Sequence, residues 1–470
     1  MELITEADRK LVKKWKPILE HTDMPVIDGP GKDYKKAVTA QVLENTSKEL
    51  FLTEDSPANV MGTSAQDVTS GNAQGFEPIL VSLLRRSVPN LMAFDIGGVQ
   101  AMKAPVSLVF AFRPTYGVTA EANSPYDPRY AGANPVPGDP DAYLREVDTR
   151  WSAKSSSSAI VSDPNSGFYV SASSTTAGTR YGAATIGEGV GSAITGYEGD
   201  IVNEMGFNID RITVTAKERA LRGSYSVQLA RDLKNMLSVD AESEIVKLLE
   251  TELQAEINRE FVRKIVLSAK QGANTGYTAT AGIFDLAVDS SGRWSPEKVK
   301  ELAFAVDREA NVIAKESRRG KGNIILCSSD VASAFAHAEL LHYPSDFKAN
   351  LQSDDTGNTY AGQMGRFKVY IDPYFQNSIS GVDLNYIVVG YKGTNPWDAG
   401  IFYCPYVPFE LFRATDPKSL QPIVAFRTRY AMTANPFVNG TPSASNAAGF
   451  GAITNGTNQY YRYFAVKNIL

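Results

Sequence analysis

The stretch DAESEIVKLLETELQAEINREFVRKIVLSAK, Asp240 to Lys270, decides the fold. Apolar side chains recur in it about every fourth residue, which is the spacing of one buried face of an α-helix. Acidic residues gather at its start and basic residues at its end, as the helix dipole favours. We therefore expect one long helix, roughly 45 Å from end to end, along which other parts of the chain pack. The buried face should consist of Ile245, Leu249, Leu253, Ile257, Phe261 and Ile265.

The composition predicts a soluble globular protein of two or three domains. The chain has 470 residues, more than one hydrophobic core usually supports. No apolar run reaches the ~18 residues that cross a bilayer, and the charged start is unlike a signal peptide, so we expect folding in a cytoplasm. Cys327 and Cys404 are too few for a disulfide framework, so both should be reduced. A net charge of −5 argues against a general polyanion binder.

Residues 1–54 are predicted to form a charged, helical leader. Leu3, Leu11 and Trp15 share one apolar stripe of its first helix, and lysines occupy the other faces. The basic face can be explained by solvation or by a membrane surface, but we favour docking on an internal partner. The following residues, 55–75, are small and polar without any period, which is typical of an extended arm.

The middle of the chain predicts a long hairpin with an insertion. Residues 99–116 and 207–216 are rich in β-branched and aromatic side chains and read as its two arms. Residues 123–199 between them are dense in Pro, Gly, Ser, Thr and Tyr. We interpret them as a small β-rich module, with a disordered linker as the alternative. A second amphipathic helix is expected over residues 296–318, and further strands over residues 323–327, 367–372, 386–391, 400–406 and 460–466.

A search for chemistry finds no constellation of catalytic or ligand-binding residues. His337 and His342 are five apart, which does not place two metal ligands on one helical face. Gly187, Gly189 and Gly191 lack the strand-then-helix setting of a phosphate loop, and the glycines beside Lys321 lack the remaining residues of a P-loop. We therefore expect no enzyme activity, no catalytic residues, no cofactor and no metal.

Long paired arms, a polar arm and a long helix bury too little of themselves within one chain. They favour a protein that assembles with copies of itself. Six blocks also resemble the major capsid protein of T4-like tailed bacteriophages, in the same order over nearly the whole chain. They are RRSVPNLMAFDIGGVQAM (Arg85 to Met102), NEMGFNIDRITVTAK (Asn203 to Lys217), AEINRE (Ala255 to Glu260), FKVYIDPY (Phe367 to Tyr374), VGYKGTNPWDAGIFYCPYVP (Val389 to Pro408) and DPKSLQPIVAFRTRYAM (Asp416 to Met432).

The resemblance implies an α+β, HK97-type capsid fold with an extended hairpin, called the E-loop, and peripheral and axial domains. The long helix would be its spine, over residues 240–270. The remaining parts would be the leader over 1–54, the N-terminal arm and a short helix over 55–98, the E-loop over 99–122 and 200–222, its insertion over 123–199, the peripheral domain over 223–283, a mostly axial domain over 284–412 and a return to the peripheral domain over 413–470.

The resemblance also implies maturation by a prohead protease that cuts after a glutamate two residues downstream of Leu or Ile. Leu52, Thr53 and Glu54, followed by Asp55, fit that pattern between the leader and the polar arm. The leader would hold subunits on scaffold core proteins through the face of Leu3, Leu11 and Trp15. Other implied partners are copies of the chain in hexamers, a vertex protein, a portal, decoration proteins and a chaperonin. The shell would enclose DNA without reading its sequence, and no membrane partner is implied.

Three other functions remain open from the residues. A vertex protein of the same fold would form pentamers, and a microbial encapsulating shell would need no phage. From a different class, a carbohydrate-binding adhesin or a hydrolase would explain the Ser/Thr/Tyr-rich insertion. Such a protein predicts an export signal and a carboxylate or histidine site, and the sequence offers neither.

Overall fold

The computed structural model describes residues 6–21, 27, 32–54, 84–85, 88, 91–116, 205–238, 240–273, 278–292, 294–342, 360–373, 375, 378–379, 382–395, 398–415, 421–435 and 453–469. The chain divides into two compact units. The first comprises Met1–Val109, Ile212–Asn439 and Gly451–Leu470, and the second comprises Phe110–Arg211 and Gly440–Phe450.

The two predicted hairpin arms pair with each other. They are β2 (Val106–Tyr116) and β3 (Met205–Thr215), which form a two-stranded sheet. The predicted E-loop extended to residue 222, but Lys217–Ser224 is a separate strand, β4, that joins another sheet. The predicted insertion, residues 123–199, and the polar arm over residues 55–75 lie outside the described residues.

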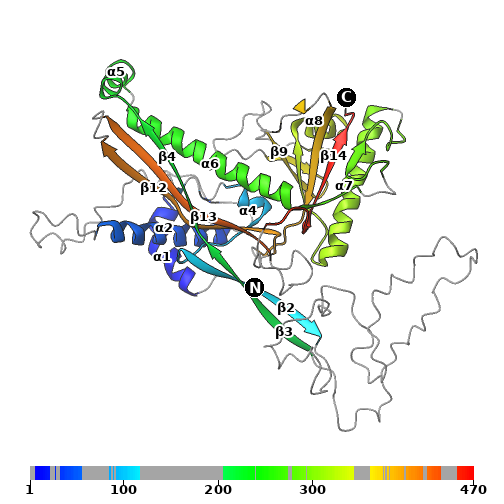
Figure 1. Ribbon diagram of the computed structural model, residues 1–470, viewed down its shortest axis with the longest axis horizontal. Coiled ribbons are helices and arrows are strands. Elements are labelled where there is room, and N and C mark those ends of the chain that lie inside the picture. Colours follow the sequence, from blue (N-terminus) through cyan, green and yellow to red (C-terminus); the bar gives the residue numbers. More distant parts are fainter. Residues whose placement is uncertain are drawn as a thin grey trace, which may run out of the picture. The chain divides into compact units, whose positions relative to one another are not determined.

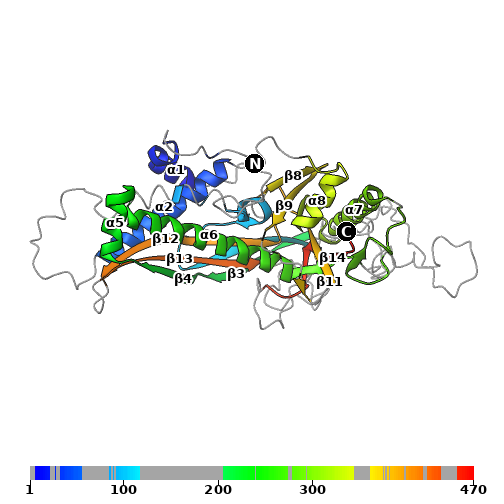
Figure 2. The same cartoon turned by 90° about the horizontal axis from the view of Figure 1, so that it is seen from above.

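A four-stranded sheet forms one half of the first unit (Figures 1 and 2). Its order is β1 (Gly98–Val99), β12 (Ile401–Thr415), β13 (Pro422–Ala434) and β4. β12 and β13 are the antiparallel arms of one long hairpin, with register shifts around Val407. Buried and partly exposed residues alternate along most of β13, because successive side chains of a strand point to opposite faces.

The predicted long helix is α6 (Ala241–Ser268), which is about 42 Å long and contacts β13 and β4. Figure 2 shows it lying along this sheet. The shorter α5 (Val227–Leu237) precedes it, capped by the Ser226 hydroxyl, which accepts from the Leu229 N–H. Helix and sheet approach so closely that a Cβ at Gly223 would lie 2.8 Å from Cγ2 of Ile245. Glycine in β4 therefore sets the depth at which the start of α6 packs.

An eight-stranded mixed sheet forms the other half of the first unit. Its order is β5, β14, β11, β7, β9, β8, with β6 also paired to β14 and β10 to β11. β7 is buried along its whole length, as expected of a central strand that runs parallel to a neighbour. The strands are β5 (Ala269–Gln271), β6 (Ile283–Asp285), β7 (Ile324–Ser328), β8 (Tyr360–Met364), β9 (Phe367–Asp372), β10 (Ser378–Ile379), β11 (Val382–Gly390) and β14 (Asn458–Lys467).

Two helices complete this half of the unit, and a short third helix leads into the four-stranded sheet. α7 (Ser295–Ser317) packs against β14 and β11, and its first turn contains Pro296, which suits a helix start. α8 (Ser329–His337) packs against β7, β9 and β11. The short α4 (Ala93–Ile96) leads into β1 and is buried almost completely.

The two sheets correct the predicted boundary at residues 412 and 413. β12, placed with the axial domain, lies in the four-stranded sheet because it pairs with β13 along nearly its whole length. β14, placed in the return to the peripheral domain, pairs instead with β11 and β6 of the eight-stranded sheet. Backbone pairing, which sequence order does not reveal, decides both assignments.

The leader is not a separate domain in the folded chain. It forms α1 (Glu6–Leu19) and α2 (Lys32–Glu54), which pack on each other. Leu19, Val38 and Leu43 belong to the same hydrophobic core as the long helix. The expectation of an independent leader was wrong because the middle of α2 offers small and apolar side chains that pack against β12.

Gly223→Ala should destabilise the chain by about 1–3 kcal/mol, since the added methyl collides with Ile245. Combining it with Ile245→Ala should cost less than the sum of the two single changes, because the second substitution removes the colliding atom. Denaturant unfolding of the unassembled chain measures all three variants. Strictly additive costs would contradict the close packing of β4 and α6.

Candidate functional site

The six residues predicted for the buried face of the long helix are not equally buried. Leu253, Ile257, Phe261 and Ile265 are buried, whereas Ile245 and Leu249, nearer the helix start, are partly exposed. The face also contains two buried polar residues, Gln254 and Asn258, that the apolar period did not predict. The Asn258 side-chain oxygen accepts from the Met92 N–H at 3.3 Å, so this side chain ties α6 to the segment before α4.

Ion pairs hold the outer side of α6 to the four-stranded sheet. Arg219 of β4 pairs with Glu256 and Glu260, and the Tyr430 hydroxyl donates to the same Glu260 carboxylate. Burial alone would raise the pKa of Glu260, but hydrogen bonds from Lys264 and Tyr430 hold it below its usual value. A carboxylate with a lowered pKa contributes stability above its unfolded pKa and loses it as the pH falls through the folded value.

A partly buried ion pair joins α6 to the eight-stranded sheet. Arg259 of α6 pairs with Asp372 at the end of β9, and the Tyr386 hydroxyl of β11 donates to Asp372 at 2.6 Å. The Asp372 side chain is only 3% exposed. A cavity of about 10 Å³ beside it, lined in part by Asn258 and Met92, has room for a single water molecule. Because a buried carboxylate needs its partners, this pair fixes where the helix crosses that sheet.

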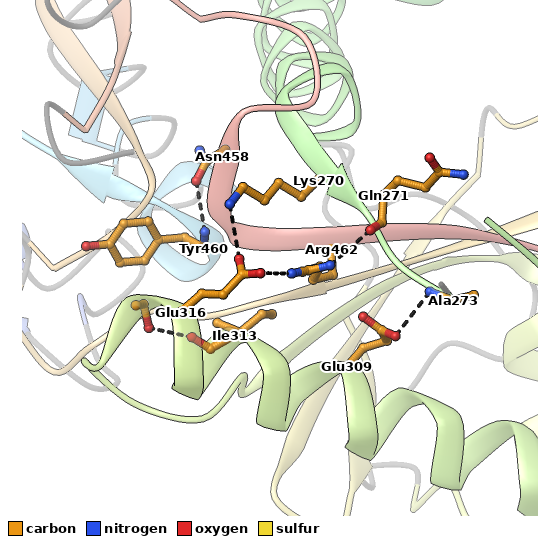
Figure 3. Close-up of polar contacts among 10 residues, drawn as sticks. Lys270, Gln271, Ala273, Glu309, Ile313, Glu316, Asn458, Tyr460 and Arg462 are labelled. Atoms are coloured by element: carbon orange, nitrogen blue, oxygen red, sulfur yellow. Dashed lines mark hydrogen bonds and ion pairs between the residues drawn. The ribbon is translucent and has the colours of Figure 1, made fainter. Parts of the chain in front are cut away.

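A second polar cluster lies where α6 ends and β5 begins (Figure 3). Glu316 of α7 lies between Lys270 of β5 and Arg462 of β14 and pairs with both. Arg462 also donates to the Gln271 carbonyl at 3.0 Å. These three elements are therefore joined by charge as well as by strand pairing.

Glu309, about two turns before Glu316 on α7, is the least satisfied carboxylate of this cluster. One oxygen accepts from the Ala273 N–H at 3.1 Å, and the other has no hydrogen-bond partner among the described residues. Burial raises the pKa of Glu309, although the Ala273 hydrogen bond and the nearby Arg462 and Arg308 oppose the rise. The carboxylate therefore costs stability when it is ionised.

Two of the three residues predicted to face a scaffold pack against the chain itself. Leu3 lies outside the described residues, while Leu11 and Trp15 pack against the main core. The Trp15 indole donates to Glu44 of α2 at 3.2 Å, and Lys14 pairs with the same carboxylate at 2.6 Å. Within the chain, α2 therefore supplies apolar and acidic partners for Leu11 and Trp15, and the binding of a scaffold by this face stays a prediction.

The middle of α2 is bound to the sheet by buried polar side chains. The Asn45 amide donates to the carbonyls of Met102, at 2.6 Å, and Tyr406, at 3.1 Å. Gln41 donates to the Asn45 side-chain oxygen at 2.9 Å, which holds the amide in this orientation. The Tyr34 hydroxyl donates to the Val99 carbonyl, and burial raises the pKa of Tyr34 well above its usual value.

The predicted cleavage tripeptide occupies the end of a helix. Leu52, Thr53 and Glu54 form the last turn of α2, and Asp55 lies outside the described residues. We expected Glu54 to lie at the boundary of an extended arm. Since a protease binds its substrate in extended form, this turn must unwind before it can be cut. Terminal turns are the parts of a helix that open most readily.

The histidines and cysteines have structural places, whereas Gly187, Gly189 and Gly191 lie outside the described residues. His337 ends α8, and His342 forms a backbone bridge with Gln363. Cys327 and Cys404 are buried free thiols, and burial raises the pKa of each to about 12. Within the described residues no group of His, Cys, Asp and Glu could hold a metal ion. None of the helices that the structure describes is long and apolar enough to cross a membrane.

These features define a structural protein whose polar clusters fix the relative placement of two sheets. The chain belongs to the major capsid protein Gp23 family, whose model matches residues 73–466. It is 33% identical to the major capsid protein of Enterobacteria phage T4 over the whole length of both chains. The capsid vertex protein of the same phage is 29% identical over 49% of this chain and 53% of its own length. Among solved structures, the capsid of Myoviridae Phage XM1 aligns with a TM-score of 0.38 and 8% identity, over 80% of this chain and 92% of that chain.

Family membership makes this chain a capsid protein of the phage virion, which associates with copies of itself into a shell. The described elements agree with the HK97-type fold that the resemblance implied. They include a long helix on a four-stranded sheet, a second sheet with its own helices, and a paired hairpin. The predicted α+β class is confirmed.

Glu309→Gln should make the chain more stable at neutral pH, by about 1 kcal/mol, because it removes a buried charge and keeps the acceptor for Ala273. An acid whose folded pKa is raised loses stability as the pH rises from the unfolded to the folded value. The gain should therefore shrink as the pH is lowered from 7 to about 4.5.

Glu301→Gln is the matched control on α7, since hydrogen bonds from Ser291 and Ser290 lower the pKa of Glu301. This control should lose stability at neutral pH, the opposite sign. Thermal unfolding at several pH values measures both variants. An equal loss in the two variants at pH 7 would contradict the assignment of Glu309 as a destabilising buried charge.

Proposed function

We propose that copies of this chain assemble as hexamers into the shell of a phage head, which encloses double-stranded DNA without reading its sequence. The observation that carries the proposal is the similarity to a major capsid protein over the whole of both chains. The vertex-protein relative matches only about half of each chain, which favours the hexamer former over the pentameric alternative. A vertex protein, a portal, decoration proteins and a folding chaperonin are the further partners that we propose.

Exposed apolar side chains on the first unit support packing between copies. Met236 on α5 and Leu248 on α6 are mostly exposed. Trp294, directly before α7, and Phe304 on α7 are mostly exposed as well. Single exposed apolar residues are common on any protein. Here the exposed apolar side chains occur on both halves of the unit, and the family to which the chain belongs forms capsids. Contacts between copies would remove these side chains from water.

We further propose that a prohead protease removes the leader after Glu54, once the last turn of α2 has unwound. The scaffold contact then belongs to the outer, charged face of α1, and not to the face of Leu11 and Trp15. Lys10, Lys13 and Lys16 are exposed on that helix. A scaffold that presents acidic side chains would complement them.

The chain expressed together with its scaffold and protease should form closed shells with six-fold capsomers, visible by electron microscopy. The purified chain alone should associate in a concentration-dependent way, because its exposed apolar side chains need partners. A chain that stays monomeric under both conditions would contradict the proposed function.

Glu54→Ala should leave the leader attached, so that the intact mass of subunits from particles equals that of the full chain. Shells should still form, but they should fail to mature. Ile18, Leu19 and Glu20 form another leader tripeptide of the same pattern, so Glu20→Ala is the control and should give subunits that begin at Asp55. Normal shortening of the Glu54 variant would place the cut elsewhere.

A further inference from the structure

The helix α2 is bound to the body like a ligand in a groove. Five successive residues, Thr39 to Leu43, are buried: Gln41 is 7% exposed and the other four are 0% exposed. The surface beneath them comprises β12 and the segment of Phe94, Val99 and Met102; we call it the leader groove. Burial of this degree matches the centre of the main core and exceeds what a loosely attached extension makes.

Polar contacts give the groove its specificity for this helix. Asn45 is 3% exposed, and its amide satisfies two main-chain carbonyls, those of Met102 and Tyr406, from distant parts of the chain. Lys35 lies over the Phe94 ring at 5.6 Å. From the body side, the buried Arg85 guanidinium donates to the Leu19 carbonyl at 2.9 and 3.2 Å. The groove therefore recognises both helices of the leader.

None of these contacts depends on the peptide bond after Glu54. Among residues 32–48 of α2, whose side chains the structure describes, the last buried one is Thr46, eight residues before Glu54, which is about two helical turns. Before the cut, the leader is held at the high effective concentration of a covalent attachment. After the cut, the same apolar burial and hydrogen bonds remain and act between two separate chains.

We infer that cutting after Glu54 does not by itself free the leader. Residues 32–54 stay in the leader groove as a noncovalent helical ligand, with α1 packed on them, and the groove remains closed to any other partner. This inference rests on the proposed processing after Glu54. Release then requires a change in the groove itself, and not only the loss of one peptide bond.

The test uses the full chain with the recognition sequence of an unrelated site-specific protease inserted directly after Glu54. After complete cutting, the leader fragment should co-elute with the body in size-exclusion chromatography at micromolar concentration. A labelled synthetic peptide of residues 32–54 should exchange into the groove, which gives its dissociation constant. A fragment that separates from the body as soon as it is cut would overturn the inference.

Asn45→Ala should weaken retention of the leader by about tenfold, because two buried carbonyls lose their donor. Lys48→Ala, whose side chain is 66% exposed one turn away, is the matched control and should leave retention unchanged. Tyr34→Phe removes a single hydroxyl and provides a milder second variant; thermal unfolding before the cut shows that each variant is folded. Equal retention of the Asn45 variant, the control and the unaltered leader would also overturn the inference.

Because an unrelated protease makes the cut, the test of leader retention does not depend on where the natural cut lies. A leader that stays bound after the engineered cut supports the inference even if particles show that the natural cut lies elsewhere. A leader that leaves at once contradicts the inference, while shells and natural processing after Glu54 can both still be observed.

Discussion

One long helix packs against two sheets, and the rest of the structure depends on that constraint. α6 contacts β13 and β4 of the four-stranded sheet, and it also contacts β14 of the eight-stranded sheet. At about 42 Å it is long enough to reach both. Arg259 and Asp372 then fix the crossing point in a partly buried ion pair, while Glu316 of α7 joins the strand that follows the helix to β14. A change in angle at either place would have to break these partly buried ion pairs, so the two halves move together unless several contacts are lost at once.

The periodic elements could be predicted from the sequence because their pattern is local. The long helix was placed within two residues of both ends, and α7 and β7 within one. The sheet assignments could not be predicted in this way. β12 and β14 read equally well as strands of either domain, and only long-range pairing with β13 and β11 separates them.

The leader shows why a buried helix can be missed when only its apolar pattern is considered. Its second helix buries Thr39, Gln41, Asn45 and Thr46 beside Val42, so the buried face is half polar and gives no clear apolar stripe. Burial of the Asn45 amide is tolerated only because it donates to two main-chain carbonyls, and the positions of these carbonyls are set by the folded chain. The hydrogen bond from the Ala273 N–H to Glu309, which joins α7 to the chain just after β5, likewise depends on positions that only the folded chain sets. Tyr34, Val38 and Val42 do form a short stripe at helical spacing, but nothing in the sequence identified its partner.

The two thiols have a consequence for the life of a particle. Cys327 and Cys404 are the only cysteines of the chain, and both are buried, with pKa values of about 12. At neutral pH they hold almost no thiolate, the form that exchanges with disulfides or reacts with oxidants. Copies crowded side by side in a shell therefore have no reactive sulfur to join neighbours by accident. Such a container can leave a reducing cell for an oxidising environment without any change in its covalent connections.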